Sequence, residues 1–142
     1  MKNLFLPVKP VWVDKILSGE KTVEIRKHFP DCVDRLFIYS SSPVKMVVGY
    51  VENPSYIHTY PGHLWNLVGE QSCVRHKDFF AYFRGCAKGY SIDLKRFKKF
   101  RYPVDILELD PEFNIPMMYK QIDDELTKKI IQVGFFGVNS LK

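Results

Sequence analysis

The sequence has no uninterrupted apolar run close to the ~20 residues that a membrane-spanning helix needs. Its first residues, Met1 to Leu4, also lack the block of about 7–15 apolar residues typical of a signal peptide. The 142 residues are enough for one compact domain, and an apolar content of 46% is enough for an ordinary core. We therefore expect a single-domain, cytoplasmic protein with no membrane partner.

Cysteine is scarce, and its pattern excludes the common cysteine-based architectures. There is no Cys-x-x-Cys pair among the three cysteines, Cys32, Cys73 and Cys86. An odd number argues against a disulfide framework and fits a reducing compartment. Histidines near Cys73 match no standard zinc spacing, and there is no Walker loop, nucleophile elbow or dinucleotide fingerprint. We expect no metal and no cofactor.

Charge is present in excess but is unevenly distributed. The formal net charge is +5; residues 61–104 carry nine basic and three acidic side chains, whereas residues 105–142 are net acidic. An electropositive region favours an anionic partner such as RNA, because lysine or arginine near a phosphate releases condensed counterions. Solubility alone explains an excess of this size equally well.

The chain alternates short strands with short helices. Pro10 suits a first helical turn and Gly19 a left-handed cap, so we expect a helix over residues 10–18, after a strand over 4–6 that ends at Pro7. Further strands are expected at residues 21–26, 35–40, 44–51, 89–94 and 104–109. Short helices are expected at residues 63–68 and 79–83, the second capped by Asp78.

One amphipathic helix is expected near the end of the chain, over residues 123–133. Asp123 is its N-cap, Leu126, Ile130 and Val133 share one side, and Gly134 ends it. That side would pack on the strands or, if exposed, serve a protein partner. The order of elements predicts an α+β fold, a small mixed β-barrel flanked by short helices.

The segment from residue 21 to residue 26 concentrates polar groups on one side of a predicted strand. Val23 and Ile25 face the core, while Thr22, Glu24 and Arg26 line the opposite face, with Lys21 at the mouth. The cations offer fixed charge for a phosphate, and the carboxylate accepts hydrogen bonds from an exocyclic amine. The simpler interpretation is an exposed ion pair between Glu24 and Arg26.

These residues also carry a family resemblance. Lys9-Pro10-x-Trp12, followed by Ile16 to Arg26, resembles the signature of the ASCH domain family, in which Gly-x-Lys-x-x-Glu-x-Arg follows a short helix. The Tyr82-Phe83-x-Gly85, Gly89–Ile92 and Phe100–Leu107 segments extend the resemblance over about residues 4–110. It implies one PUA-like domain over residues 1–142, with the last helix as an extension.

The resemblance implies a cleft between the first helix and the barrel that binds RNA or a nucleotide-like ligand. Trp12, Tyr82 and Tyr90 are the candidates for stacking on a base. The full set of candidate ligand-binding residues is Lys9, Trp12, Lys21, Thr22, Glu24, Arg26, Tyr82, Tyr90 and Ser91.

The same resemblance leaves two other functions open. Some relatives are amidohydrolases acting on acylated cytidines or are ribonucleases, and others are transcription coregulators. The amidohydrolase pattern has Thr three residues after the signature lysine, and this chain has Glu24 there instead. If the chain is an enzyme acting on RNA or modified nucleosides, Lys21 and Glu24 are the candidate catalytic residues.

A second basic feature is the run from Lys95 to Arg101, with five cations in seven residues. Lys98, Lys99 and Arg101 would contact a nucleic-acid backbone without reading its sequence. The alternative is a strand edge that its charge protects from aggregation.

Overall fold

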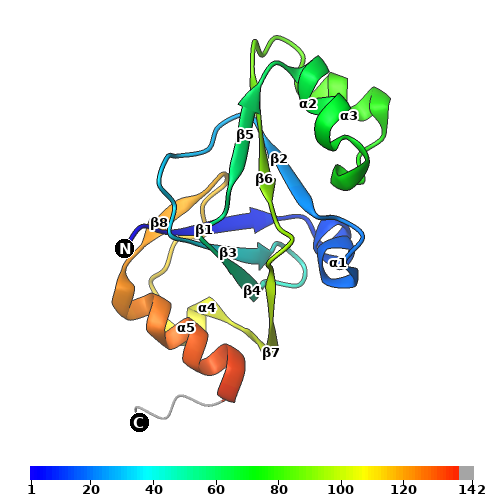
Figure 1. Cartoon of the computed structure of the whole chain (residues 1–142). Coiled ribbons are helices and arrows are strands. Elements are labelled where there is room, and N and C mark those ends of the chain that lie inside the picture. Colours follow the sequence, from blue (N-terminus) through cyan, green and yellow to red (C-terminus); the bar gives the residue numbers. More distant parts are fainter. Residues whose placement is uncertain (138–142) are drawn as a thin grey trace. The chain divides into compact units, whose positions relative to one another are not determined.

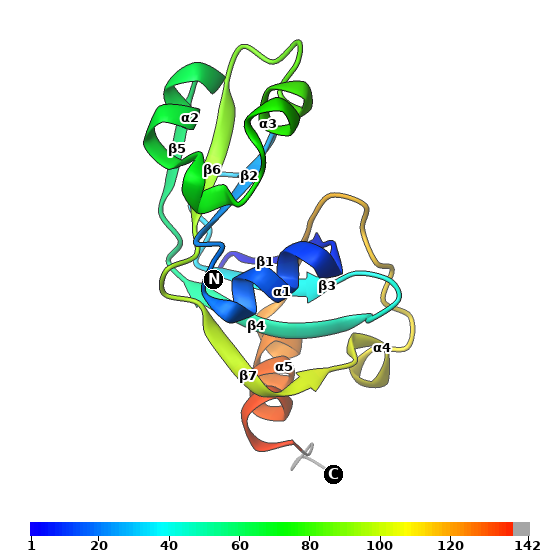
Figure 2. The same ribbon diagram turned by 90° about the vertical axis from the view of Figure 1, so that its right-hand side faces the viewer.

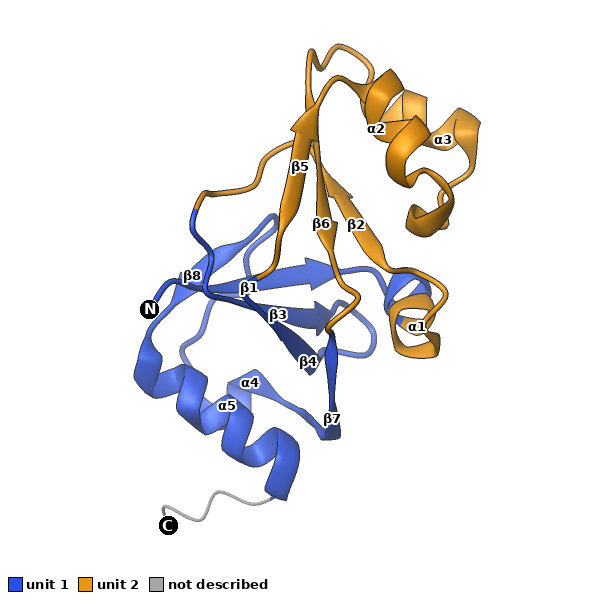
Figure 3. Ribbon diagram, viewed as in Figure 1, with its two compact units in different colours: residues 1–13, 32–53, 97–142 blue, residues 14–31, 54–96 orange. Residues whose placement is uncertain are grey.

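The computed structural model describes residues 1–137 and divides them into two compact units (Figure 3). Unit 1 comprises residues 1–13, 32–53 and 97–137, and unit 2 comprises residues 14–31 and 54–96. Figure 1 shows the elements in chain order. The helix α1 (Pro10–Ser18) begins in unit 1 and ends in unit 2.

Unit 1 contains a five-stranded mixed sheet in the order β7-β4-β3-β1-β8. The central pair, β1 and β3, is parallel, and the other neighbours are antiparallel. Its strands are β1 (Asn3–Val8), β3 (Arg35–Ser40), β4 (Met46–Glu52), β7 (Lys98–Val104) and β8 (Lys120–Ile122). The sheet ends in β7 on one side and β8 on the other, so the part of the basic run that lies in β7, Lys98 to Arg101, forms a sheet edge.

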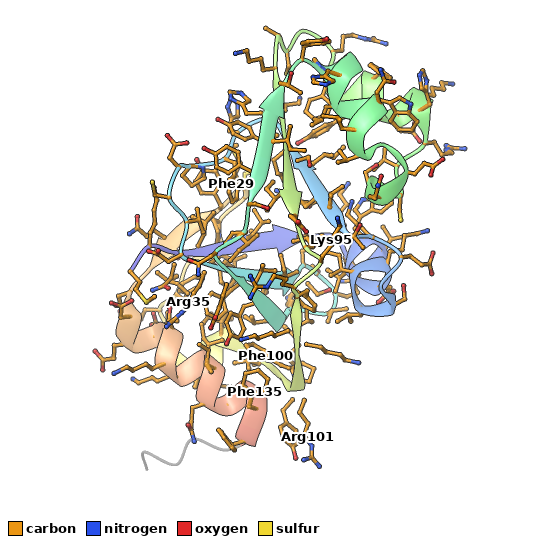
Figure 4. The ribbon with its side chains drawn as sticks, viewed as in Figure 1. Phe29, Arg35, Lys95, Phe100, Arg101 and Phe135 are labelled. Atoms are coloured by element: carbon orange, nitrogen blue, oxygen red, sulfur yellow. The ribbon has the colours of Figure 1, made fainter. Side chains whose placement is uncertain are left out.

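The core of unit 1 is rich in aromatic side chains, and the helix α5 (Asp124–Phe136) packs on it. Phe100 of β7 lies 5.3 Å from Phe135 of α5 between ring centroids (Figure 4). Ile130 is fully buried in the same cluster, with Leu126 and Val133 against it. The apolar side of this helix therefore packs inside unit 1, one of the two outcomes left open by the sequence.

Unit 2 contains a three-stranded antiparallel sheet in the order β2-β6-β5, with helices on one face. Figure 2 shows α2 and α3 beside these strands. Val23 and Ile25 of β2 pack with Leu64, Val68, Phe79 and Phe83 of the helical segments. The elements are β2 (Val23–Arg26), β5 (Tyr56–Thr59), α2 (Pro61–Val68), η1 (Glu70–Ser72), α3 (His76–Tyr82) and β6 (Gly89–Asp93).

Several expected elements are confirmed. The helix α1 has the predicted bounds, and Gly19 adopts φ +85° immediately after it. Strands β3 and β4 form the expected antiparallel hairpin. Asp123 caps α5 by accepting a hydrogen bond from the Leu126 amide at 2.7 Å. The α+β fold class is confirmed, and no helix within residues 1–137 is long and apolar enough to cross a membrane.

Two expected strand boundaries are wrong. Pro7 does not end the first strand, because β1 runs on to Val8. The proline is tolerated there because the pairing of β8 with β1 covers Asn3–Phe5 and stops before Pro7. On that side of β1, the missing amide hydrogen of Pro7 therefore interrupts no hydrogen bonds between strands. Residues 106–109 are not a strand but the one-turn helix α4 (Ile106–Leu109), whose N-cap Asp105 accepts from the Leu107 amide.

Two expected caps are also wrong. Asp78 lies inside the first turn of α3, paired with Arg75, and the helix begins at His76 without a side-chain cap. Gly134 does not end α5 but lies buried within it against Phe100, where a Cβ atom would come within 2.5 Å of the ring. Gly137, with φ +80°, is the actual C-cap.

Candidate nucleic-acid interface

The signature segment is held in place by backbone hydrogen bonds within unit 2. After Gly19 reverses the chain, the amide of Lys21 donates to the carbonyl of Lys15 at 3.0 Å. The amide of Thr22 then donates to Gln71 at 3.0 Å, and the Thr22 carbonyl accepts from Leu94 at 2.8 Å. These bonds fix the backbone on both sides of Lys21 before β2 begins at Val23.

Lys21 is a buried cation with defined partners. Its side chain is 1% exposed, and its Nζ donates to the carbonyl of Ser72 at 2.6 Å and lies 3.3 Å from Glu24 Oε1. Ser72 is itself fixed, because its hydroxyl donates to Gly69 at 2.6 Å and accepts from the Val74 amide at 3.2 Å. A buried charge needs such pairing, since desolvation without a partner is costly.

Glu24 connects this buried lysine to the more accessible Arg26. The Arg26 guanidinium donates to Glu24 Oε2 from Nη2 at 2.8 Å and from Nε at 3.2 Å. The Glu24 side chain is 7% exposed and that of Arg26 is 20% exposed. Two cations share one carboxylate, so the cluster carries a net positive charge that Arg26 brings to the surface.

Tyr82, at the end of α3, lies next to this cluster. Burial raises the pKa of its phenol, an effect that the positive charge of Arg26 and a hydrogen bond with the Lys27 backbone partly offset. The Lys27 ammonium also lies 5.0 Å from the centroid of the Tyr82 ring. The phenol therefore keeps its proton to a higher pH than an ordinary tyrosine does, and it remains a hydrogen-bond donor.

Strand register places aromatic side chains on the same face of the sheet as Arg26. Arg26 lies opposite Tyr90 across β2 and β6, and Tyr90 lies opposite His58 across β6 and β5. Directly opposed residues share a face, and the face alternates along each strand. We call this surface the Arg26 face, and its residues are Glu24, Arg26, Tyr56, His58 and Tyr90.

The rings of the Arg26 face are stacked. His58 and Tyr90 are nearly parallel, with 4.0 Å between centroids and an interplanar angle of 4°. Tyr56 lies 5.6 Å from Tyr90, and its hydroxyl donates to Asp31 at 2.8 Å. Phe29, labelled in Figure 4, packs against both tyrosines. The result is an aromatic surface next to a guanidinium.

The structure distributes the remaining expected site residues over other places. Ser91 lies opposite Ile25 and Ile57, on the helix-covered face of the sheet, away from the Arg26 face. Thr22 precedes β2 and is half-buried. Lys9 and Trp12 belong to unit 1, where the Lys9 carbonyl accepts the amides of Trp12 and Val13 at the start of α1.

The basic residues of β7 also lie in unit 1. Lys98 pairs with Glu52 at 3.6 Å and lies 5.5 Å from the Tyr50 ring, whereas Lys99 is exposed. Arg101 extends away from β7 in Figure 4 and lies 5.3 Å from the ring of Tyr102. This edge therefore combines protein-paired and solvent-directed cations.

Sequence reasoning missed the contribution of β5 to the Arg26 face. His58 is one of the histidines that match no zinc spacing with Cys73, and Tyr56 lies in a stretch whose turn-forming residues obscure the strand. The alternation in Tyr56-Ile57-His58-Thr59 was the available signal. Among residues 1–137, no group of three or more His, Cys, Asp or Glu side chains is arranged to hold a metal ion.

Comparison with known proteins bears on the family resemblance. The ASCH domain model matches residues 6–73. A protein of Zymomonas mobilis subsp. mobilis named "ASCH domain-containing ribonuclease" is 26% identical over 137 residues, covering 93% of this chain and 92% of that protein. The crystal structure of ASCH from Zymomonas mobilis superimposes with a TM-score of 0.83 at 26% identity, covering 93% of this chain and 95% of that one. These matches confirm the resemblance to the ASCH domain family.

A second relative is similar over a shorter part of its length. The large ribosomal subunit protein uL22 of Ureaplasma parvum serovar 3 is 32% identical over 96 residues. The match covers 68% of this chain but 29% of that protein. It therefore concerns a segment of the ribosomal protein.

Proposed function

We propose that this chain is an RNA-binding ASCH module, comprising residues 1–142, whose ligand contacts the Arg26 face. The observation that carries the proposal is the stacked His58–Tyr90 pair next to the Arg26 guanidinium on one sheet face. Aromatic rings on a sheet provide stacking surfaces for unpaired bases, and arginine contacts phosphates and base edges. Such a ligand suits the net positive charge of the cluster and a cytoplasmic location.

The buried pair Lys21 and Glu24 has a positioning role in this proposal. Lys21 is fully enclosed and bonded to Ser72 and Glu24, and Glu24 in turn holds the guanidinium of Arg26. A guanidinium held by a carboxylate loses less side-chain entropy when it binds a phosphate. Arg26 and Tyr90 then make the contacts with RNA, and Lys21 acts through Glu24.

Cleavage of RNA is a second candidate function, favoured by the name of the Zymomonas relative, which matches nearly the full length of both chains. Metal-independent cleavage needs a base that takes the proton of the 2′-hydroxyl and an acid that gives one to the leaving 5′-oxygen. Two groups that can exchange a proton lie at the proposed site: the imidazole of His58 on the Arg26 face, and the phenol of Tyr82 next to Glu24 and Arg26. Lys21 and Glu24 remain the alternative pair.

Binding of a fluorescently labelled, mixed-sequence single-stranded RNA tests the first proposal. Arg26→Ala should weaken binding about 10- to 100-fold, as expected for a lost charge-assisted contact. Arg84→Ala, which removes an equal charge from an exposed position of unit 2, is the matched control and should bind as the unmodified protein does. Equal affinities for the two variants would contradict the proposed site.

The stacking contribution needs its own pair of variants. Tyr90→Leu keeps an apolar side chain but removes the ring, and should weaken RNA binding by about 1–3 kcal/mol. Tyr60→Leu, at an exposed position outside the Arg26 face, is the control. Unchanged binding by Tyr90→Leu would remove the stacking surface from the proposal.

Cleavage is tested with the same RNA on a denaturing gel, with and without a chelator. If the chain is a ribonuclease that uses the proposed groups, Tyr82→Phe should slow cleavage while leaving RNA affinity within about twofold, and His58→Gln should slow cleavage by more than it weakens RNA binding. Cleavage that survives both substitutions but stops in a Glu24→Gln variant that is still folded and still binds RNA would assign the chemistry to the Lys21–Glu24 pair. Absence of cleavage by the unmodified protein would exclude the ribonuclease function and leave RNA binding as the only proposed function.

A further inference from the structure

The segment that follows β2, residues 27–31, folds back over the Arg26 face. Its first residue, Lys27, lies against the Tyr82 ring and forms a backbone hydrogen bond with the Tyr82 phenol, which fixes the start of the segment next to β2. Its last residue, Asp31, accepts a hydrogen bond from the Tyr56 hydroxyl of β5 at 2.8 Å. We call residues 27–31 the strap. The strap and both tyrosines lie in unit 2.

Phe29, in the middle of the strap, packs on the aromatic residues of the Arg26 face. Its ring lies 6.1 Å from Tyr56 and 6.3 Å from Tyr90 between centroids, with interplanar angles of 63° and 54°. Phe29 is 5% exposed, and Figure 4 labels it beside β5. Tilted and edge-to-face contacts of this kind are favourable between aromatic rings. Phe29 therefore occupies apolar surface of two rings that belong to the proposed RNA site.

The strap is held in place by side chains rather than by its backbone. Within residues 1–137, none of residues 27–30 forms a backbone–backbone hydrogen bond. Pro30 has no amide hydrogen to donate. Segments with few backbone hydrogen bonds open at a lower free energy than the strands beside them. The hydrogen bond between Tyr56 and Asp31 and the packing of Phe29 are thus the contacts that hold the strap over the sheet.

We propose that the strap is an autoinhibitory contact: Phe29 takes the place of a stacked base on the Arg26 face, and the unpaired bases of RNA displace it. This inference rests on the proposed RNA-binding function and adds its regulation. A phenyl ring and a base compete for the same tyrosines, because each gains apolar contact by covering an aromatic surface. The strap leaves His58 exposed and the Arg26 side chain 20% exposed, so RNA can make its first contacts there before the strap moves.

The inference predicts an effect of opposite sign to the loss of a binding residue. When only the open form binds fully, the measured affinity is reduced by the fraction of molecules that are open. A change that weakens the strap but leaves the stacking rings in place should therefore strengthen RNA binding. If the strap instead holds Tyr56 and Tyr90 in their binding geometry, the same change should weaken it.

Tyr56→Phe tests this prediction directly, because it removes the hydrogen bond to Asp31 and keeps the ring. Binding of the fluorescently labelled single-stranded RNA should become about three- to tenfold tighter, as expected for the loss of one exposed hydrogen bond that closes the site. Tyr60→Phe removes a hydroxyl from an exposed tyrosine outside the Arg26 face, and this control should bind as the unmodified protein does. Unchanged or weaker binding by Tyr56→Phe would overturn the inference.

A strand without bases separates displacement of the strap from contact with phosphates. An abasic ribose-phosphate oligomer of the same length has no ring to take the place of Phe29. Its affinities for Tyr56→Phe and for the unmodified protein should agree within about twofold, because backbone contacts do not depend on the bases. A gain in Tyr56→Phe that is equally large for the abasic strand would contradict competition between Phe29 and bases.

Hydrogen exchange measured by NMR detects the movement of the strap itself. In the free protein, the amides of His28 and Phe29 should exchange about fivefold faster in Tyr56→Phe than in the unmodified protein, whereas the amide of the fully buried Ile92 in β6 should not change. Addition of RNA to the unmodified protein should also speed exchange at His28 and Phe29. Slower exchange at these two amides would mean that RNA covers a closed strap, and would contradict its displacement.

The strap and the proposed function fail in different ways in these experiments. RNA binding that is the same in Arg26→Ala and Arg84→Ala contradicts the proposed RNA site, and the strap with it. RNA binding that is weakened by Arg26→Ala but not strengthened by Tyr56→Phe contradicts the strap alone. Binding that is weakened by the first substitution and strengthened by the second supports both.

Discussion

Arg26 and Glu24, two residues apart on β2, are joined by two hydrogen bonds from the guanidinium to one carboxylate oxygen, at 2.8 and 3.2 Å. The other oxygen of Glu24 lies 3.3 Å from the ammonium of the buried Lys21. One carboxylate therefore orders an accessible cation and compensates an inaccessible one. The spacing of Lys21, Glu24 and Arg26 in the signature therefore lets one carboxylate contact both cations.

Glu24→Gln should destabilise unit 2, because it removes the carboxylate charge that lies 3.3 Å from the buried ammonium of Lys21. We expect a loss of about 3 kcal/mol in the free energy of unfolding, measured by urea denaturation. Glu20→Gln is the matched control, since Glu20 is exposed and, among residues 1–137, its carboxylate accepts only from the hydroxyl of Ser18. Its effect should be within about 0.5 kcal/mol. Equal stability of the two variants would refute the role given to the buried pair.

Gly134→Ala should destabilise unit 1 by about 1–3 kcal/mol, because the added Cβ would overlap the ring of Phe100. Gly62→Ala is the opposite case. Gly62 lies in α2 with its nearest neighbouring atoms 3.9 Å from an added Cβ, so alanine should stabilise that helix by up to about 1 kcal/mol. Thermal unfolding of the two variants should move in opposite directions, and a shared direction would contradict the packing of α5.

Tyr82 should ionise above its ordinary value of 10.0, since burial disfavours the phenolate. The difference in tyrosinate absorbance between the unmodified protein and Tyr82→Phe isolates this group during an alkaline titration. Because the folded-state pKa is raised, the proton stabilises the fold below pH 10, and this stability is lost as the pH rises through the folded-state pKa. A Tyr82 that ionises at or below 10.0 would be inconsistent with the partial burial of its phenol.

Lys99→Ala tests whether the β7 edge contacts a nucleic-acid backbone. If Lys99 contacts a phosphate, the slope of log affinity against log salt should become shallower by about 0.7 for single-stranded RNA. Lys98→Ala is the informative comparison, since Lys98 is paired with Glu52 and should change the slope less. An unchanged slope in Lys99→Ala would show that Lys99 contacts no phosphate. It would support the alternative that the charges of β7 protect this sheet edge from aggregation.

The elements that sequence reasoning predicted well are those with strong local signals. Pro10 begins α1, and Gly19 follows its last residue. Both positions could be predicted because the ring of proline and the left-handed φ of glycine are properties of the residue itself and need no distant contact. Asp123 marks α5 for the same reason. The alternation in residues 22–26 correctly separated the core-facing Val23 from Glu24 and Arg26, because side-chain direction follows directly from strand period.

The errors arise where tertiary contacts override local preference. Pro7 is tolerated in β1 because of where β8 stops pairing, and Gly134 is required by the ring of Phe100, neither of which lies nearby in the sequence. The grouping of Ser91 with Arg26 failed to account for strand register, which puts them on opposite sheet faces. His58 joins the Arg26 face only through the pairing of β5 with β6.

Photo-crosslinking tests the central claim most directly, because it identifies the residues that touch RNA. A single-stranded RNA containing 4-thiouridine is crosslinked to the full chain, and the modified residues are identified by mass spectrometry. The account predicts crosslinks at Tyr90, His58 or Tyr56, and their loss in Arg26→Ala but not in Arg84→Ala. Crosslinks confined to residues 98–104 of β7, unchanged by Arg26→Ala, would contradict it.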